Sequence, residues 1–276
     1  FDAINHAMST VATGGFSTSD ASMGKFGPSA HWVAVFFMIV GSLPFTLYVM
    51  TLRGHRTALF RDQQVRGFVL MLAITSVLFS GWYWLNNDVP ALDALRIVTF
   101  SVVSVVTTTG FAVDDYTQWG GFAVMAFFYM TFIGGCSGST SGGLKMFRFQ
   151  VAYSLLRANF KQLIHPRAVI RQQYNGHNLD EEIVRSILPF PFFITMTIGV
   201  LALCLALLGV GPITALTGAA TAVCNVGPGL GEIIGPAGNF STLPDTAKWL
   251  LSIGMLLGRL EIITVLVLLT PAFWRH

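Results

Sequence analysis

Three short segments rich in small residues recur along the chain, each directly after an apolar run. The central one covers residues 106–111 (Val-Thr-Thr-Thr-Gly-Phe), and the other two cover residues 11–16 and 223–228. Gly takes positive φ at no steric cost, so such a run can lie extended and expose its carbonyl oxygens. Three copies predict three walls of one ion-selective pore.

Backbone carbonyls are the chemistry that these segments offer. Irregular backbone at membrane depth is tolerated where it lines a polar cavity or is buried in protein, and rings of carbonyls can replace the hydration shell of K⁺. The alternative is that these segments only let helices pack closely. The predicted potassium-binding residues are Ala12, Thr13, Gly14, Gly15, Thr107, Thr108, Thr109, Gly110, Cys224, Asn225, Val226 and Gly227.

An acid follows each segment at the same distance when Gly15, Gly110 and Gly227 are aligned. Five residues after these glycines stand Asp20, Asp115 and Glu232. Together they would form a negative outer vestibule that concentrates cations. The alternative is that they are ordinary solvated loop acids.

The composition indicates a membrane protein. The chain has 276 residues, 53% hydrophobic and only 11% charged, whereas soluble domains are about one quarter charged. The uncharged runs 116–144 and 186–231 exceed the roughly 20 residues that a spanning helix needs. The sequence has no CxxC pair, Ser/His/Asp set or P-loop, which argues against an enzyme and against a zinc or redox site. Nothing in it indicates a nucleic-acid partner.

The elements that must position the segments are predicted to be helices throughout. Short helices are expected at 2–12, 92–106 and 212–224, polar loops at 17–30 and 166–182, and further helices at 119–133 and 145–164. Full spans are expected at 32–52, kinked at Pro44, and at 67–86, 183–208 and 248–270. The repeating unit is span, short pore helix, filter turn, span. The predicted fold class is therefore an all-α membrane protein with such units around a pseudo-fourfold pore.

Charge placement predicts the orientation. Residues 53–66 and 145–185 hold eleven of the sixteen Lys and Arg, whereas most acids fall near the filter turns. The positive-inside rule places the basic loops in the cytoplasm and the filter turns outside.

A run made only of small residues interrupts the predicted helices at 134–143. It consists of Gly134, Gly135, Cys136, Ser137, Gly138, Ser139, Thr140, Ser141, Gly142 and Gly143. With Leu144 and Lys145, this run resembles the signature loop of the TrkH branch of the Trk/Ktr/HKT superfamily of potassium transporters. Residues 12–16, 107–111 and 224–229 resemble the second, third and fourth filter segments of that family.

The resemblance implies that four repeats form one pore within a subunit and that the chain lacks the first. It assigns 1–66 to a partial second repeat, 67–182 to the third and 183–276 to the fourth. It also implies K⁺ uptake across the bacterial inner membrane, a homodimer, and a cytosolic TrkA-like nucleotide-binding ring as partner. ATP, ADP or NAD would act only through that partner, and no cofactor is expected in this chain.

The resemblance further implies a gate. The run 134–143 would lie beneath the filter as an intramembrane loop, and its glycines disfavour a helix on their own. A weakly held segment suits a moving gate, whereas the alternative is a fixed linker. Lys145 would contact the loop carbonyls or mark the cytoplasmic face. Arg259, expected well inside the last span, would act as an electrostatic barrier in the pore, or would instead form a buried structural ion pair.

Two other functions remain open. One is a secondary cation symporter with broken helices around a midplane site, although such carriers usually show inverted repeats. The other is a membrane scaffold with re-entrant packing helices, against which the triplicated segment argues.

Overall fold

The computed structural model describes residues 1–167, 173–179, 181–187, 189–268, 270–271 and 273–274. These residues are mostly helical, as predicted for an all-α membrane protein, and they include one short hairpin. In chain order the elements are α1 (Asp2–Val11), η1 (Ser22–Lys25), α2 (Pro28–Gly41), α3 (Phe45–Leu52), α4 (Ala58–Arg61), α5 (Gln63–Asn86), α6 (Ala91–Val106), η2 (Tyr116–Trp119), α7 (Gly121–Met130), α8 (Met146–Ile164), β1 (Gln173–Tyr174), β2 (His177–Asn178), α9 (Glu181–Ile187), α10 (Pro189–Leu207), α11 (Pro212–Cys224), α12 (Asp245–Arg259) and α13 (Ile262–Leu268).

The three short helices agree with the prediction to within one residue at either end. Helix α1 packs on α2, α6 packs on α5 and α2, and α11 packs on α10 and α12. Pro90 precedes α6, and Pro212 opens α11, where a missing backbone N–H costs nothing. Tertiary packing therefore places each short helix against at least one longer helix.

Two helices are long and apolar enough to cross a membrane by themselves, namely α5 and the stretch Val184–Leu207, which contains α10. Helix α5 begins four residues before the predicted span because Asp62 caps it. The Asp62 carboxylate accepts a hydrogen bond from the Val65 N–H at 3.0 Å, which satisfies a donor that the first turn leaves unpaired.

Two further apolar helix pairs are broken rather than straight. Helices α2 and α3 meet at 87°, so the bend at Pro44 is sharper than the predicted kink. Pro44 ends the break and directly precedes the first residue of α3. Helices α12 and α13 meet at 102°, so the apolar segment predicted as a span at 248–270 is sharply bent rather than straight. Glu261 has φ +58° between them, a conformation that cannot continue a right-handed helix.

The predicted loops also contain local structure. Helix η1 lies within the loop predicted at 17–30, and α2 already begins at Pro28. The polar loop predicted at 166–182 contains the hairpin β1–β2, in which Tyr174 pairs with His177. Residues 168–172 and 180 of that loop lie outside the described residues.

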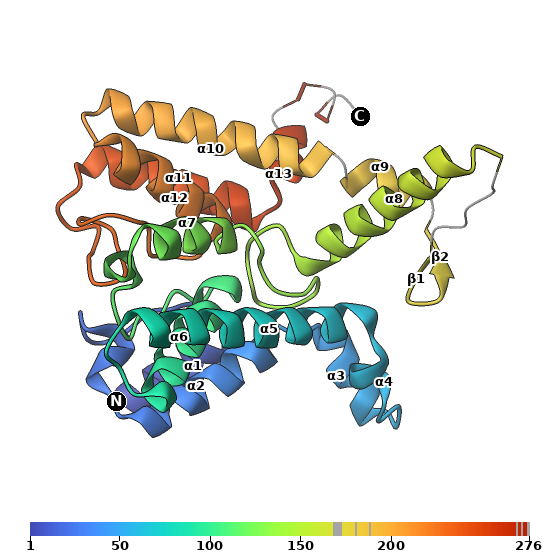
Figure 1. The fold of residues 1–276 in the computed structure, drawn as a ribbon. Helices are drawn as coiled ribbons and strands as arrows, with labels where there is room; N and C mark the ends of the chain where they lie inside the picture. The colour runs from blue at the N-terminus through green and yellow to red at the C-terminus, as the bar shows by residue number, and fades with distance from the viewer. Residues whose placement is uncertain (168–172, 180, 188, 269, 272, 275–276) are drawn as a thin grey trace.

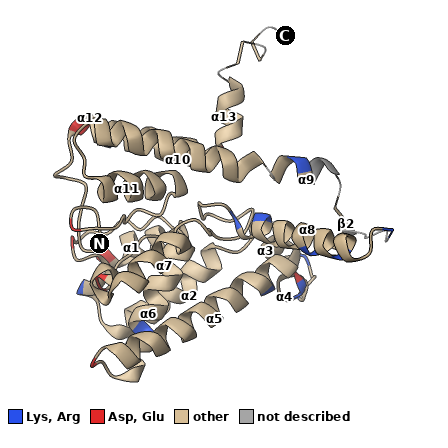
Figure 2. Cartoon of the chain, turned by 45° about the horizontal axis from the view of Figure 1, so that its top comes forward, with Lys and Arg blue, Asp and Glu red and all other residues tan. Residues whose placement is uncertain are grey.

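Two hydrophobic cores hold the helices together. One is formed mainly by α2, α5, α6 and α7, and the other by α10, α11 and α12; Phe128 and Phe132 pack against both. Figure 1 shows the corresponding two layers, with the blue-green helices α1–α6 in one and the orange-red helices α10–α12 in the other. Basic side chains gather toward α4, α8 and α9 (Figure 2), the end opposite the start of α12.

Candidate pore and its loop

The three short helices end in the same backbone conformation. The left-handed residues at these ends are Thr13, Thr108 and Asn225, with φ of +47°, +57° and +57°. The two threonines directly follow the C-cap, and Asn225 is itself the C-cap. Non-Gly residues rarely adopt positive φ; Asn is among the types that tolerate it, whereas a β-branched residue such as Thr is an outlier there. The recurrence at aligned positions shows that the three turns are built alike.

Matching hydrogen bonds accompany this conformation. The N–H of the left-handed residue donates three residues back, at 3.1, 3.0 and 3.1 Å, and the next N–H donates five residues back, at 2.8, 2.9 and 3.0 Å. This pair of bonds is the Schellman motif. The second set of bonds joins Gly14 to Ser9, Thr109 to Ser104 and Val226 to Thr221.

The caps leave the negative ends of three helix dipoles beside the filter turns. A helix C-terminus carries about half an elementary negative charge, which favours a cation nearby. A cation placed beside these three helix ends would therefore be stabilised without a carboxylate.

Neighbouring turns approach each other so closely that two glycines have no room for a side chain. A Cβ on Gly15 would lie 1.9 Å from the Thr109 carbonyl oxygen, and one on Gly110 would lie 2.0 Å from the Val226 carbonyl oxygen. The corresponding position on Gly227 meets nothing within 4 Å. The first turn thus lies against the second and the second against the third, whereas the described residues leave the Cβ position of Gly227 in the third turn open.

A cavity of about 560 Å³ lies between the turns. Its lining includes nine of the twelve predicted filter residues, namely Ala12, Thr13, Gly14, Gly15, Thr109, Gly110, Asn225, Val226 and Gly227. The other three, Thr107, Thr108 and Cys224, are buried. Thr107 and Thr109 join their hydroxyls at 2.7 Å.

The 134–143 run passes directly beneath these buried residues. The Gly142 N–H donates to Thr108 Oγ1 at 2.6 Å, and the Gly143 N–H donates to the Cys224 carbonyl at 3.0 Å. A Cβ on Gly142 would lie 2.4 Å from the Cys224 carbonyl oxygen. The Thr13 hydroxyl also donates to Thr140 Oγ1 at 3.1 Å, so the loop contacts all three turns.

The same loop is bound to the break between α2 and α3. The Cys136 N–H donates to the Ser42 carbonyl at 3.0 Å, and the Thr140 hydroxyl donates to the Gly41 carbonyl at 2.9 Å. Ser141 and Ser42 join their hydroxyls at 2.9 Å. The loop has low helix propensity as predicted, but hydrogen bonds from distant segments hold it, so it is not weakly held in this structure.

Four charged residues surround a cavity of about 230 Å³ next to this loop. The Lys145 ammonium donates to the Ser141 carbonyl, and Arg148 pairs with Glu261 at 3.1 Å. Arg148 also lies 3.7 Å from the centre of the Phe190 ring. Arg259 donates from Nη1 to the Thr140 carbonyl at 2.6 Å.

The position of Arg259 corrects one prediction. It is the last residue of α12, at the break before α13, rather than well inside a continuous span. It lines both the cavity between the turns and the cavity beneath the loop. Among the described residues it forms no ion pair, so the predicted alternative of a buried pair with an acid has no partner there.

The three predicted vestibule acids are not equivalent. Asp20 lines the cavity between the turns, whereas Asp115 and Glu232 do not. Asp115 instead caps η2 by accepting from the Thr117 N–H at 3.0 Å. Glu232 is exposed.

Sequence reasoning missed a hydroxyl that recurs six residues before each aligned glycine. The Phe16 N–H donates to Ser9 Oγ at 2.8 Å, and Ser104 Oγ donates to the Phe111 carbonyl at 2.6 Å. Thr221 Oγ1 is buried with no partner among the described residues. Extending the alignment of the three segments backward along their helices would have revealed this position.

Short helices whose capped ends meet at one cavity, beside helices long and apolar enough to cross a membrane, define the class of helical membrane proteins. The family model TrkH, described as a cation transport protein, matches residues 1–275. The chain belongs to the TrkH family.

Individual relatives agree with this assignment. All of this chain aligns with the potassium uptake protein TrkI of Halomonas elongata at 58% identity and with TrkH of Escherichia coli at 35% identity. The crystal structure of the potassium transporter TrkH from Vibrio parahaemolyticus superposes on 99% of the chain with a TM-score of 0.92 and 35% identity. The chain spans 56% of TrkI, 57% of E. coli TrkH and 59% of the V. parahaemolyticus chain.

Proposed function

We propose that this chain forms three walls of a pore for K⁺ uptake. The observation that carries the proposal is the convergence of three identically capped helices on one cavity lined by the predicted filter residues. Relatives named as potassium uptake proteins over the whole chain support the choice of K⁺. A fourth wall would stand on the open side, next to Gly227.

Selectivity would arise from carbonyl oxygens held in place by the close approach of neighbouring turns. The Thr109 and Val226 carbonyls each lie against a glycine of the preceding turn. Carbonyls that cannot spread or collapse replace the hydration shell of one ion size better than another. Helix dipoles add a favourable potential for any cation.

Control of flow would belong to the 134–143 loop and Arg259. The loop binds the lower filter residues Thr108 and Cys224, so an open path requires it to move. Arg259 keeps a positive charge beside the loop through its bond to the Thr140 carbonyl. Both features support a closed conformation in which the loop obstructs the path.

The larger setting is also a proposal. The divisions 1–66, 67–182 and 183–276 would be the second, third and fourth repeats, in a multi-pass protein of the bacterial inner membrane. The protein would act as a homodimer with a cytosolic TrkA-like nucleotide-binding ring, which fits its membership of a Trk system by the names of its relatives. The function is transport rather than catalysis.

The secondary symporter differs from a pore in its symmetry. The three capped turns share one chain direction and one set of hydrogen bonds, whereas carriers of that kind usually pair inverted halves. A scaffold would have no need for positive φ at three aligned non-Gly residues, since such strain is concentrated at functional sites.

The direct test is ion density in crystals of the full-length protein grown in Rb⁺. We expect an anomalous Rb⁺ peak in the cavity at the level of Thr108 and Gly110 that persists when Na⁺ is present in tenfold excess over Rb⁺. Loss of the Rb⁺ peak in excess Na⁺ would contradict selectivity for K⁺-sized ions, and an empty cavity in Rb⁺ alone would contradict the pore itself.

A further inference from the structure

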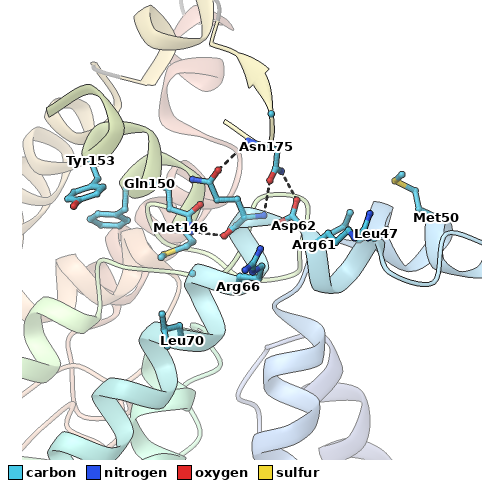
Figure 3. A pocket seen from close by; sticks show the side chains of 15 residues that line it. Leu47, Met50, Arg61, Asp62, Arg66, Leu70, Met146, Gln150, Tyr153 and Asn175 are labelled. Atoms are coloured by element: carbon cyan, nitrogen blue, oxygen red, sulfur yellow. Dashed lines mark hydrogen bonds between the residues drawn. The ribbon is translucent and has the colours of Figure 1, made fainter. Parts of the chain in front are cut away.

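A second and larger cavity lies away from the pore. It measures about 1130 Å³ and is enclosed by α3, α4, the first turns of α5, the first turns of α8 and the β1–β2 hairpin. Figure 3 shows polar side chains such as Asp62, Gln150 and Asn175 at the centre of one open groove, with apolar side chains such as Met50 and Leu70 to either side. We call it the α5–α8 groove.

A closed hydrogen-bond network forms the polar wall of the α5–α8 groove. Asn175 donates from Nδ2 to Asp62 at 2.7 Å and accepts from the Gln63 N–H at 2.7 Å. Gln150 donates to the Gln63 carbonyl at 3.2 Å and accepts from the Tyr174 hydroxyl at 2.9 Å. Burial raises the pKa of Tyr174 above its usual range, so the phenol stays a donor. The wall is therefore built before any ligand arrives.

Two arginines on this wall have no carboxylate partner. Arg61 and Arg66 line the groove and are exposed, and neither forms an ion pair among the described residues. The acid between them, Asp62, already accepts from Asn175 and from the Val65 N–H. Guanidinium groups match the geometry of phosphate oxygens, so the wall offers an unfilled site for a phosphate.

The rest of the groove is apolar and leads toward the membrane. Arg66 and Leu70 stand four residues apart on one face of α5, as do Phe149 and Tyr153 on α8, and all four line the groove. Leu70 is 61% exposed and Tyr153 67%. The same face of α5 continues through Ile74 and Val77, which are also exposed. Large apolar side chains exposed in a row indicate a lipid contact in a membrane protein.

We propose that the α5–α8 groove binds one anionic phospholipid of the cytoplasmic leaflet. Its phosphate lies between Arg61 and Arg66, and an acyl chain follows Leu70 and Ile74 along α5. Basic pockets between spanning helices on the cytoplasmic side suit such head groups. A soluble protein would match the arginines but not the apolar face that runs on into the membrane.

The test is lipid retention measured by native mass spectrometry on delipidated full-length protein. Phosphatidylglycerol and phosphatidylethanolamine are added back in turn at equal concentration. We expect the wild type to retain several-fold more phosphatidylglycerol. The double variant Arg61→Ala/Arg66→Ala should bind it roughly thirtyfold less tightly, since each arginine contributes about 1 kcal/mol near an anionic surface and 1.4 kcal/mol is tenfold.

Matched variants keep the result decisive. Arg157→Ala removes an exposed charge from α8 outside the groove lining and should leave retention within about twofold. Arg61→Lys/Arg66→Lys keeps both charges and should weaken phosphatidylglycerol binding by no more than about fivefold. This variant replaces the alanine variant in the test if the alanine variant is unstable.

Four outcomes would overturn the proposal. Equal retention of the two lipids would show no preference for anionic head groups, and an equal loss in Arg157→Ala would show only general surface charge. Displacement by a tenfold excess of glycerol 3-phosphate would make the ligand a soluble phosphate. A lower dimer fraction in the arginine variants with unchanged lipid retention would make the groove a contact between two copies of the protein.

Discussion

At the scale of single residues, the effect of substituting a glycine in these turns depends on which atoms lie opposite its missing Cβ. Gly110 combines φ +82° with a neighbouring carbonyl 2.0 Å from its missing Cβ. Backbone atoms cannot give way as a flexible side chain can, so a substitution there must displace the Val226 carbonyl. Arg259 likewise matters through the Thr140 carbonyl that it holds.

We expect Gly110→Ser to weaken discrimination between K⁺ and Na⁺ by roughly tenfold in a protein that still folds, because a displaced carbonyl no longer fits one ion size. Rb⁺ uptake into liposomes with Na⁺ as competitor measures this. Gly54→Ser is the control, since Gly54 has φ +104° but nothing within 4 Å of its Cβ position. Unchanged Na⁺ competition in folded Gly110→Ser protein would show that this carbonyl does not select.

We expect Arg259→Ala to raise cation flux by roughly tenfold and Arg259→Lys to change it much less. Like charges about 4 Å apart repel by roughly 4 kcal/mol at an effective dielectric constant of 20, and water in the cavity reduces that figure. Flux per folded protein and the melting temperature are measured together. A destabilised and slower Arg259→Ala protein would instead assign the residue a structural role.

At the scale of elements, the broken helices and the loop between α7 and α8 form one connected assembly. The loop is held by the α2–α3 break on one side and approached by the α12–α13 break on the other. Movement of either break therefore changes the support of the loop.

We expect deletion of residues 138–142 to raise basal flux, because it removes the Gly142 contact with Thr108. Thr140→Val is the milder companion: it keeps the loop but loses the hydroxyl bond to the Gly41 carbonyl, and it should raise flux less. Uptake without any soluble partner is the measurement. A folded deletion protein that carries no more ions than its parent would show that the loop does not obstruct the path.

Arg148 on α8 links two other elements, because it pairs with Glu261 at the α12–α13 break and contacts Phe190 on α10. Its side chain is only 16% exposed and contacts the Phe190 ring, whereas Glu261 is 56% exposed. A half-exposed ion pair contributes less than about 1 kcal/mol, and a partly desolvated cation–π contact contributes up to about 2 kcal/mol. Thermal unfolding should therefore be lowered more by Arg148→Ala than by Glu261→Gln; equal losses would assign the stability to the ion pair.

At the scale of the whole molecule, the charge asymmetry predicts which end enters the cytoplasm. Basic residues gather toward α4, α8 and α9 (Figure 2), and the positive-inside rule makes that end cytoplasmic. The filter cavity, with Asp20 in its lining, then opens toward the outside.

Labelling by an impermeant thiol reagent in intact cells tests this orientation. In a Cys204→Ser background, where Cys136 and Cys224 are buried, Ala237→Cys should react from outside. Gln173→Cys in the hairpin should react only after the membrane is opened. The reverse pattern would invert the orientation and place the filter on the cytoplasmic side.

Features that depend on local pattern could be predicted from the sequence. Uncharged runs identified the membrane protein, the apolar runs before the repeated segments located the three short helices, and the aligned glycines identified the turns that line one cavity. The aligned residues Thr13, Thr108 and Asn225 share a positive φ, because each of the three turns ends a helix beside the same cavity.

Only the tertiary structure decided where distant segments meet. The sharp bends at Pro44 and Glu261, the bonds that hold the 134–143 loop, and the end position of Arg259 all depend on partners tens of residues away. The hydrogen bond from Asn175 to Asp62 joins residues 113 positions apart, and no periodic pattern in the sequence predicts it. Propensity and hydropathy report a residue's preference for a local conformation and for burial, whereas these contacts are selected by the packing of whole helices.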